Sequence, residues 1–397
     1  MSTFRLAHIS DTHLGYRAIN KLDPESGRNQ RSVDTDIAFT RLIDDLIARK
    51  VDGVIHSGDV FHHSRPTWQS MRHFIRQMRR LEQAGIPTIV IAGNHDTPRI
   101  RTGGSAYSVL ELALPDITFV TEFEDAVGLE TFAGHDIIVQ AIPHGSLTNP
   151  DPVFASPKAG VRNILTTHGL VPGVLPEGIV TEPGEQLLDH HLLDSRFDYI
   201  ALGHIHQAQQ VSANAWYSGS TERFGWNDVT AVPGYNLVTF GDNGAVDVTR
   251  IEGVSRPMIA LPHVSGQGRE GRIIADTVME RLERLKAPDA MVRVEVRDAG
   301  RPIRREVQSI LRRESGQHVW HTDLAPERSM FQPQPDSVDE SDSPLDLHVL
   351  FHEFVSQRRA GYPNDEFTAA FLERGDRALT DALVMEEAPL PEEDNIA

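Results

Sequence analysis

Short apolar runs alternate with longer amphipathic stretches along the first 250 residues of the chain. Short runs of apolar and β-branched residues predict buried strands. They are Arg5–Ser10, Gly53–Ser57, Pro87–Ala92, Ile137–Ile142, Asn163–Thr167 and Tyr199–Leu202. Apolar residues at helical spacing predict helices at Thr35–Ala48 and Pro66–Ala84, with Pro66 in the first turn and Gly85 as the stop. Strands alternating with helices predict an α/β fold in layers.

The pattern changes after the last of these strands. The stretch Trp216–Ile251 has strand and turn signals without a helical period, and it predicts that antiparallel pairs complete a sheet. From about Arg256 a second unit is predicted. It has a helix at Ile273–Lys286, a strand at Met291–Val296 and a helix at Ile303–Arg313. We expect domains at 1–255 and 256–322.

The C-terminal part has a different composition. Residues 323–344 are rich in Pro, Ser and acidic residues, which predicts a disordered linker. Residues 345–397 follow as a helical tail, with helices predicted at Leu345–Gln357 and Glu366–Met385. Apolar side chains form a stripe on each helix; they are Leu345, Leu347, Leu350, Phe351 and Phe354, then Phe367, Phe371, Leu372 and Leu379. Stripes without a domain of their own suit binding in a partner's groove, and the alternative is that they fold back on their own core.

Composition limits the chemistry that is available. The chain has 397 residues, of which 39% are hydrophobic, so it can bury a sizeable core. It has no cysteine, which excludes disulfides, thiolate ligands and cysteine nucleophiles. It shows no signal peptide and no apolar run long enough to span a membrane. We therefore expect a cytoplasmic protein whose metals, if any, are held by His, Asp, Glu or Asn.

A net charge of −19 at first disfavours a nucleic-acid partner. The charge is concentrated, however, because residues 323–397 hold 18 acidic residues against 5 arginines. Residues 267–314 hold 12 basic residues against 9 acidic ones. Bound metal ions would also attract phosphate, and a formal charge count omits them.

Five polar motifs follow the ends of predicted strands, where open α/β sheets place their ligand sites. They are Asp11-Thr12-His13, Gly58-Asp59-Val60-Phe61-His62, Gly93-Asn94-His95-Asp96, Thr167-His168-Gly169 and Gly203-His204-Ile205-His206. Two divalent ions need a ligand that touches both, and the carboxylate of Asp59 is the natural candidate. A single histidine after a strand is more often a surface or core residue, but five such motifs in this order make coincidence improbable. Of the remaining histidines, His63 and His144 stand nearest to these motifs.

The ordered motifs resemble those of the calcineurin-like metallophosphoesterases, and more narrowly the SbcD-type exonucleases and the double-strand-break repair nuclease subunit. Further segments carry the narrower resemblance; they are 11–17 (DTHLGYR), 58–66 (GDVFHHSRP), 203–209 (GHIHQAQ), 219–228 (GSTERFGWND) and 233–240 (PGYNLVTF). The match is good over residues 4–250. It implies a β-sandwich flanked by helices, a small α/β capping domain and a helical tail. His62 resembles the archaeal and eukaryotic form, where many bacterial members have Asp.

The resemblance also implies a role for each residue. Asp11, His13, Asp59 and His206 would hold one metal ion, and Asp59, Asn94, His168 and His204 would hold the other. His95 would donate a proton to the leaving oxygen, Asp96 would position its ring, and His62 would orient the phosphate. Mixed oxygen and nitrogen ligands without sulfur suit Mn²⁺, Fe²⁺ or Zn²⁺, and the resemblance favours Mn²⁺ among them.

Partners follow from the same resemblance. We expect DNA as the substrate, a large SMC-like coiled-coil ATPase at the tail, and a homodimer. The helix at Pro66–Ala84 could form the dimer interface, or its apolar stripe could simply pack against the sheet. Arginines of the capping domain are candidate phosphate contacts, although they could equally be solvated; they are Arg269, Arg272, Arg301, Arg304, Arg305, Arg312 and Arg313. Two alternatives remain open, a metallophosphoesterase for a small phosphodiester or phosphoprotein, and a non-catalytic scaffold of the same fold.

Overall fold

The computed structural model describes residues 3–98, 104–123, 127–129, 132, 135–149, 155–174 and 185–325, and parts of the C-terminal tail between 348 and 380. The chain divides into two units, Met1–Glu327 and Arg328–Ala397. Within the described residues, no helix is both long and apolar enough to cross a membrane. Most of the predicted linker, residues 326–344, lies outside the described residues.

The first sheet has the strand order β12-β11-β1-β2-β3-β4. Strands β1 (Phe4–Ile9), β2 (Gly53–His56), β3 (Thr88–Ile91) and β4 (Ile117–Val120) are parallel. Strands β11 (Gly234–Phe240) and β12 (Val246–Glu252) continue the sheet as antiparallel neighbours. The prediction that antiparallel pairs complete a sheet is therefore confirmed.

The second sheet has the order β5-β6-β7-β8-β10-β9. Its central strands β6 (Ile137–Ile142), β7 (Arg162–His168) and β8 (Tyr199–Gly203) are parallel, and the shorter strands are β5 (Val127–Leu129), β9 (Gln209–Gln210) and β10 (Ala215–Tyr217). Buried side chains of both sheets meet in one apolar cluster that includes Phe4, Ile55, Val139 and Tyr199. The predicted β-sandwich is thus confirmed.

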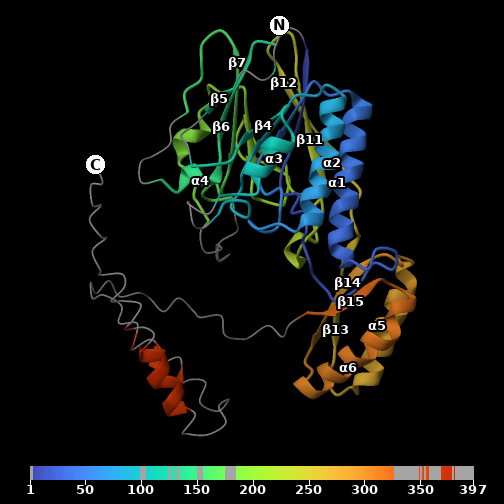
Figure 1. Cartoon of the computed structure of the whole chain (residues 1–397). Helices are drawn as coiled ribbons and strands as arrows, with labels where there is room; N and C mark the ends of the chain where they lie inside the picture. Colours follow the sequence, from blue (N-terminus) through green and yellow to red (C-terminus); the bar gives the residue numbers. More distant parts are fainter. Residues whose placement is uncertain are drawn as a thin grey trace. The chain divides into compact units, whose positions relative to one another are not determined.

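Helices cover the outer face of the first sheet (Figure 1). They are α1 (Gln30–Arg49), α2 (Trp68–Gln83) and α3 (Tyr107–Ala113). Helix α2 begins after Pro66, because Thr67 is its N-cap and accepts a hydrogen bond from the backbone N–H of Ser70. The predicted start at Pro66 was therefore two residues early. Shorter helical turns are α4 (His144–Leu147), η2 (His190–Leu193) and η3 (Trp226–Asp228).

Residues 258–324 build a separate three-stranded sheet with its own core. Strands β13 (Met258–Ser265), β14 (Met291–Arg297) and β15 (His321–Leu324) are all parallel. Helices α5 (Gly271–Leu285) and α6 (Arg301–Glu314) and the turn η4 (Ser315–Gln317) connect them, and apolar residues such as Ile274, Val278, Val292 and Val307 fill the core. Strand β15 carries this small domain past the predicted end at residue 322.

In the C-terminal unit, the described residues of both predicted tail helices are helical. The rings of Phe351 and Phe371 lie 5.9 Å apart. Asp376 pairs with His348 at 3.0 Å and with His352 at 2.7 Å. Most of the predicted stripe lies outside the described residues, namely Leu345, Leu347, Leu350, Phe354, Phe367 and Leu379.

Candidate metal centre

The five motifs lie at the carboxyl ends of strands from both sheets. Asp11 and His13 follow β1, Asp59 follows β2, and Asn94 follows β3. From the second sheet, His168 ends β7, and His204 and His206 follow β8. Because the sheets pack face to face with their parallel strands ending at one edge, all seven predicted ligands come together there.

The loops that carry the ligands have unusual backbone conformations. Asp11, His13 and Asp59 have φ values of 51°, 41° and 56°, and His204 has a φ of 113°. Backbone hydrogen bonds hold two of these loops together, since the N–H of His13 donates to the carbonyl oxygen of Asp59 at 3.0 Å. A second close approach joins the two sheets, because Gly203 at the end of β8 lies against Ser57 after β2, where a Cβ on Gly203 would be 1.9 Å from the carbonyl oxygen of Ser57.

One group of converging ligand atoms comes from Asp11, His13 and His206, which lie within 4.8 Å of one another. His206 Nδ1 donates to the carboxylate of Asp228 at 3.0 Å. Its Nε2 is therefore the ring nitrogen that faces the site, and this atom lies 3.2 Å from Nε2 of His13. Orientation of a ligand histidine by a carboxylate behind it is typical of metal sites.

A second group contains Asp11, Asp59 and His168, again within 4.8 Å. His168 Nδ1 donates to the carbonyl oxygen of Ser57 at 2.8 Å, so its Nε2 faces the site. That Nε2 lies 2.9 Å from Oδ1 of Asn94, and the same oxygen lies 3.2 Å from Nδ1 of His204. All three predicted partners of Asp59 on this side are thus adjacent.

The Asp59 carboxylate lies between the two groups. Its Oδ2 is 3.6 Å from His13 Nε2 and 3.4 Å from His168 Nε2. Burial alone would raise its pKa, but His168 and His13 lower the pKa of Asp59 well below its usual range. Burial lowers the pKa of His168, whereas Asp59 and Asp11 raise it to about 9. The buried carboxylates therefore attract positive charge to this position, and the donor set fits two divalent cations.

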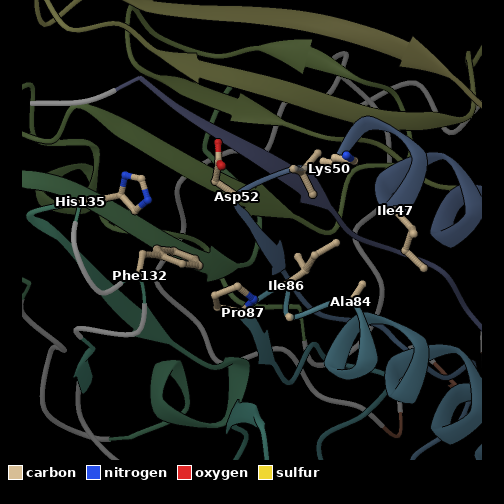
Figure 2. A pocket seen from close by; sticks show the side chains of 10 residues that line it. Ile47, Lys50, Asp52, Ala84, Ile86, Pro87, Phe132 and His135 are labelled. Carbon is tan, nitrogen blue, oxygen red and sulfur yellow. The ribbon is translucent and has the colours of Figure 1, made fainter.

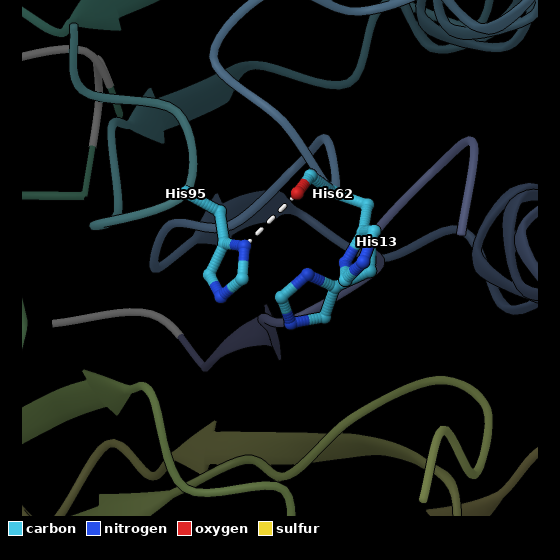
Figure 3. A group of neighbouring side chains, drawn as sticks. All are labelled: His13, His62 and His95. Carbon is cyan, nitrogen blue, oxygen red and sulfur yellow. Dashed lines mark hydrogen bonds between the residues drawn. The ribbon is translucent and has the colours of Figure 1, made fainter. Parts of the chain in front are cut away.

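His95 is placed beside the ligands with its ring held from behind (Figure 3). Its Nδ1 donates to the carbonyl oxygen of His62 at 2.9 Å, and its backbone N–H donates to Oδ1 of Asp59 at 2.9 Å. A carbonyl oxygen only accepts, so Nδ1 carries the hydrogen and Nε2 remains for proton transfer. The ring of His62 stacks on that of His95 with centroids 5.2 Å apart, and burial followed by His63 lowers the pKa of His62 to about 4.

Asp96 has contacts that differ from those expected. Its carboxylate accepts hydrogen bonds from the backbone N–H groups of Val60 at 2.8 Å, Phe61 at 2.9 Å and Gly93 at 3.3 Å. It thereby joins the loop after β2 to the loop after β3. The partner of the His95 ring is the carbonyl oxygen of His62, so the expectation that Asp96 positions this ring is corrected.

Two further carboxylates were not identified from the sequence. Asp228 holds His206, and Glu185 lies 3.1 Å from Nε2 of His204. Asp228 lies within the 219–228 segment, where the aromatic residue Phe224 also packs edge-on against His13 and His206. The family-like segment was the sequence signal for Asp228, whereas no motif singled out Glu185. His144 is buried with its ring 6.4 Å from that of His168, and the ring of His63 lies 4.5 Å from that of His62.

A cavity of about 500 Å³ lies at the opposite ends of the strands (Figure 2). Residues preceding β2, β3 and β6 line it, among them Lys50, Ile86, Phe132 and His135. It contains none of the predicted metal ligands, so it is separate from the site described above.

Comparison with known proteins agrees with this geometry. The family model of the calcineurin-like phosphoesterases matches residues 4–208. The chain belongs to the calcineurin-like phosphoesterase family. The predicted class of enzyme, a hydrolase of phosphoesters, is thereby confirmed, and the fold family implies divalent metal ions.

The sequence is similar to three archaeal proteins, each a DNA double-strand break repair protein Mre11. The protein of Haloferax volcanii is 33% identical over 75% of this chain and 62% of its own length. Those of Thermoplasma acidophilum and Methanopyrus kandleri are 32% and 27% identical, over 64% and 90% of this chain and 67% and 77% of their own lengths. The chain thus spans less than two thirds of the Haloferax volcanii relative. The predicted resemblance to the double-strand-break repair nuclease subunit is confirmed.

Proposed function

We propose that this protein is a two-metal nuclease that hydrolyses phosphodiester bonds of DNA in double-strand-break repair. The observation that carries the proposal is the position of Asp59 between two groups of ligands, with His95 beside them and outside both. The three relatives, each a DNA double-strand break repair protein, support DNA as the substrate.

In this proposal Asp11, His13, Asp59 and His206 hold one ion, and Asp59, Asn94, His168 and His204 hold the other. We propose Mn²⁺ for both; oxygen and nitrogen ligands without sulfur suit it as they suit Fe²⁺ or Zn²⁺, and the family resemblance favours Mn²⁺. When bound, two such ions neutralise phosphate charge and lower the pKa of a water from about 15.7 toward neutrality.

The chain's own residues supply the remaining chemistry. The 3′-alkoxide is a poor leaving group, so it needs a proton. His95 gives that proton from Nε2, because the carbonyl oxygen of His62 occupies Nδ1. The ring of His62, stacked on that of His95, is placed to orient the phosphate. Asp96 acts indirectly, by fixing the loops that carry Asp59 and His95.

Partners form part of the same proposal. The small domain at 256–322 acts as a cap over DNA, and the tail at 345–397 docks on an SMC-like ATPase of the SbcC type. Two copies pair through α2, whose Trp68 is 84% exposed, and such a large apolar side chain in water suits an interface. The protein acts in the cytoplasm at the nucleoid.

Parallel assays of a simple phosphodiester, a nucleotide, a phosphopeptide and duplex DNA test the substrate. We expect metal-dependent cleavage of DNA to exceed that of the other substrates. Preference for the small phosphodiester or phosphopeptide would replace the nuclease with the alternative phosphoesterase. Absence of cleavage with both metals bound would favour the scaffold, which the complete ligand set and His95 disfavour.

A further inference from the structure

A second polar cavity, of about 430 Å³, lies where the loop before α1 meets the small domain. Lys21 comes from the loop, Arg312 and Ser315 from the end of α6, and His321 and Thr322 from β15. None of the seven proposed metal ligands lines it. Its volume is within the range of roughly 300–1,000 Å³ that small ligands occupy.

The charge in this cavity has one sign. Three lining side chains, Lys21, Arg312 and His321, are basic, and none of the lining residues is acidic. Burial and then Arg256 lower the pKa of Lys21, while burial and then Lys21 lower the pKa of His321. The basic groups therefore repel one another. Asp323 acts on His321 in the opposite sense, but it is bonded to Arg293 at 2.6 Å.

Thr322 lines the cavity without offering its hydroxyl to it. Its partner across the sheet is Val292, which lies in the apolar core of the small domain, whereas His321 points to the other face of β15. The Oγ1 atom of Thr322 is buried, so the ligand contacts of the cavity come from Lys21, Arg312 and His321.

The wall of the cavity is held in place from both sides. Lys21 donates from Nζ to the carbonyl oxygen of Trp320 and lies 5.0 Å from the centre of its ring. The guanidinium of Arg256 lies 4.3 Å from the centre of the same ring and forms two hydrogen bonds of 2.7 Å to Asp34. The loop and the small domain are thus tied together beside the cavity, which favours a preformed site.

We propose that this cavity binds a phosphate group through Lys21, Arg312 and His321. Two sources share this chemistry, a free phosphate monoester such as a mononucleotide and a backbone phosphate of DNA. Only the second source rests on the proposed nuclease function. The phosphate site is tested by binding and the nuclease function by cleavage. Failure of one proposal can therefore be distinguished from failure of the other.

The test uses the full chain and two neighbouring arginines. Arg312 lines the cavity and Arg313 does not, although both are exposed residues of α6. Calorimetric titration of inorganic phosphate and of dAMP, with chelator present, compares Arg312→Gln with Arg313→Gln. We expect Arg312→Gln to weaken binding at least tenfold and Arg313→Gln less than twofold. Equal effects, or no effect of Arg312→Gln, would overturn the site.

Thr322→Val is a second control, because valine matches threonine in shape and the hydroxyl that it removes faces the core. We expect an unchanged or higher melting temperature and phosphate binding within twofold of that of the unaltered chain; a tenfold loss of phosphate binding would contradict our assignment of the ligand contacts. Duplex DNA titrated against the same variants identifies the source. Weaker DNA binding by Arg312→Gln, with a salt slope reduced by about one, indicates a backbone phosphate. DNA binding equal to that of the unaltered chain indicates a free monoester.

Discussion

Replacing His95 with alanine should separate metal binding from chemistry. The side chain makes one hydrogen bond, from Nδ1 to the carbonyl oxygen of His62. Losing it costs about 1 kcal/mol of stability, a typical value for one hydrogen bond. The bond from the backbone N–H of residue 95 to Asp59 does not involve the side chain and persists in the variant. The fold and both groups of ligands should therefore remain.

The loss in rate should be much larger than the loss in stability. General-acid catalysis by a positioned histidine contributes about 10²–10⁴-fold, and His95→Ala should reduce single-turnover cleavage by such a factor. That factor corresponds to about 3–5 kcal/mol in the activation barrier. DNA affinity, measured by fluorescence anisotropy, should change little.

The control is Asp59→Gly. Glycine accepts the φ of 56° at this position, so the substitution removes the carboxylate with little backbone strain. Elemental analysis after gel filtration should show that Asp59→Gly has lost metal and that His95→Ala has retained it. Equal metal loss in both variants would show that His95 is a ligand, and our assignment of the proton donor would be wrong.

Four further predictions test other parts of the molecule. Chelation should abolish cleavage, Mn²⁺ should restore it and Mg²⁺ should restore it poorly; full activity in protein shown to be metal-free would refute the two-metal proposal. Asp96→Ala should lower the free energy of unfolding in urea by about 3–5 kcal/mol, because it leaves the buried N–H groups of Val60 and Phe61 unpaired. Burial raises the pKa of Asp34, but the hydrogen bonds from Arg256 and Arg31 lower it further, to below its usual value. The ionised carboxylate therefore stabilises the fold above about pH 4, and this stabilisation is lost as the pH falls. Asp34→Ala should therefore lower the melting temperature more at pH 7 than at pH 3, and an equal effect at both would contradict this. Deleting 340–397 should preserve cleavage and abolish pull-down of the ATPase; loss of cleavage would mean that the tail packs on the catalytic unit.

The sequence predicted the strands that are buried along nearly their whole length. They are β1, β2, β3, β6, β7 and β8, and a run of apolar or β-branched residues marks each of them. Strand β15 was missed, because His321 and Asp323 interrupt the pattern with polar side chains. Its pairing with β14 comes from the tertiary fold, which local periodicity does not contain.

The sequence predicted those site residues whose side chains are typical metal ligands and stand in short motifs. Asp59 and His168 stand in short motifs at strand ends, and the structure brings them together. The partner of the His95 ring could not be found in this way, because it is a backbone carbonyl that any residue at position 62 would provide. Asp228 was likewise hidden, since its pairing with His206 spans 22 residues.

The left-handed backbone of the ligand loops has a consequence for how this protein can evolve. Asp11, His13 and Asp59 occupy a region that costs most residues about 1–2 kcal/mol each. Glycine at any of the three would relieve this backbone strain while removing a ligand. At Asp11 and Asp59 it would also leave the backbone N–H groups of His204 and His95 without their acceptors, which offsets the gain. Durable variants of the enzyme must gain their stability at sites remote from the cleft, such as the apolar core between the sheets.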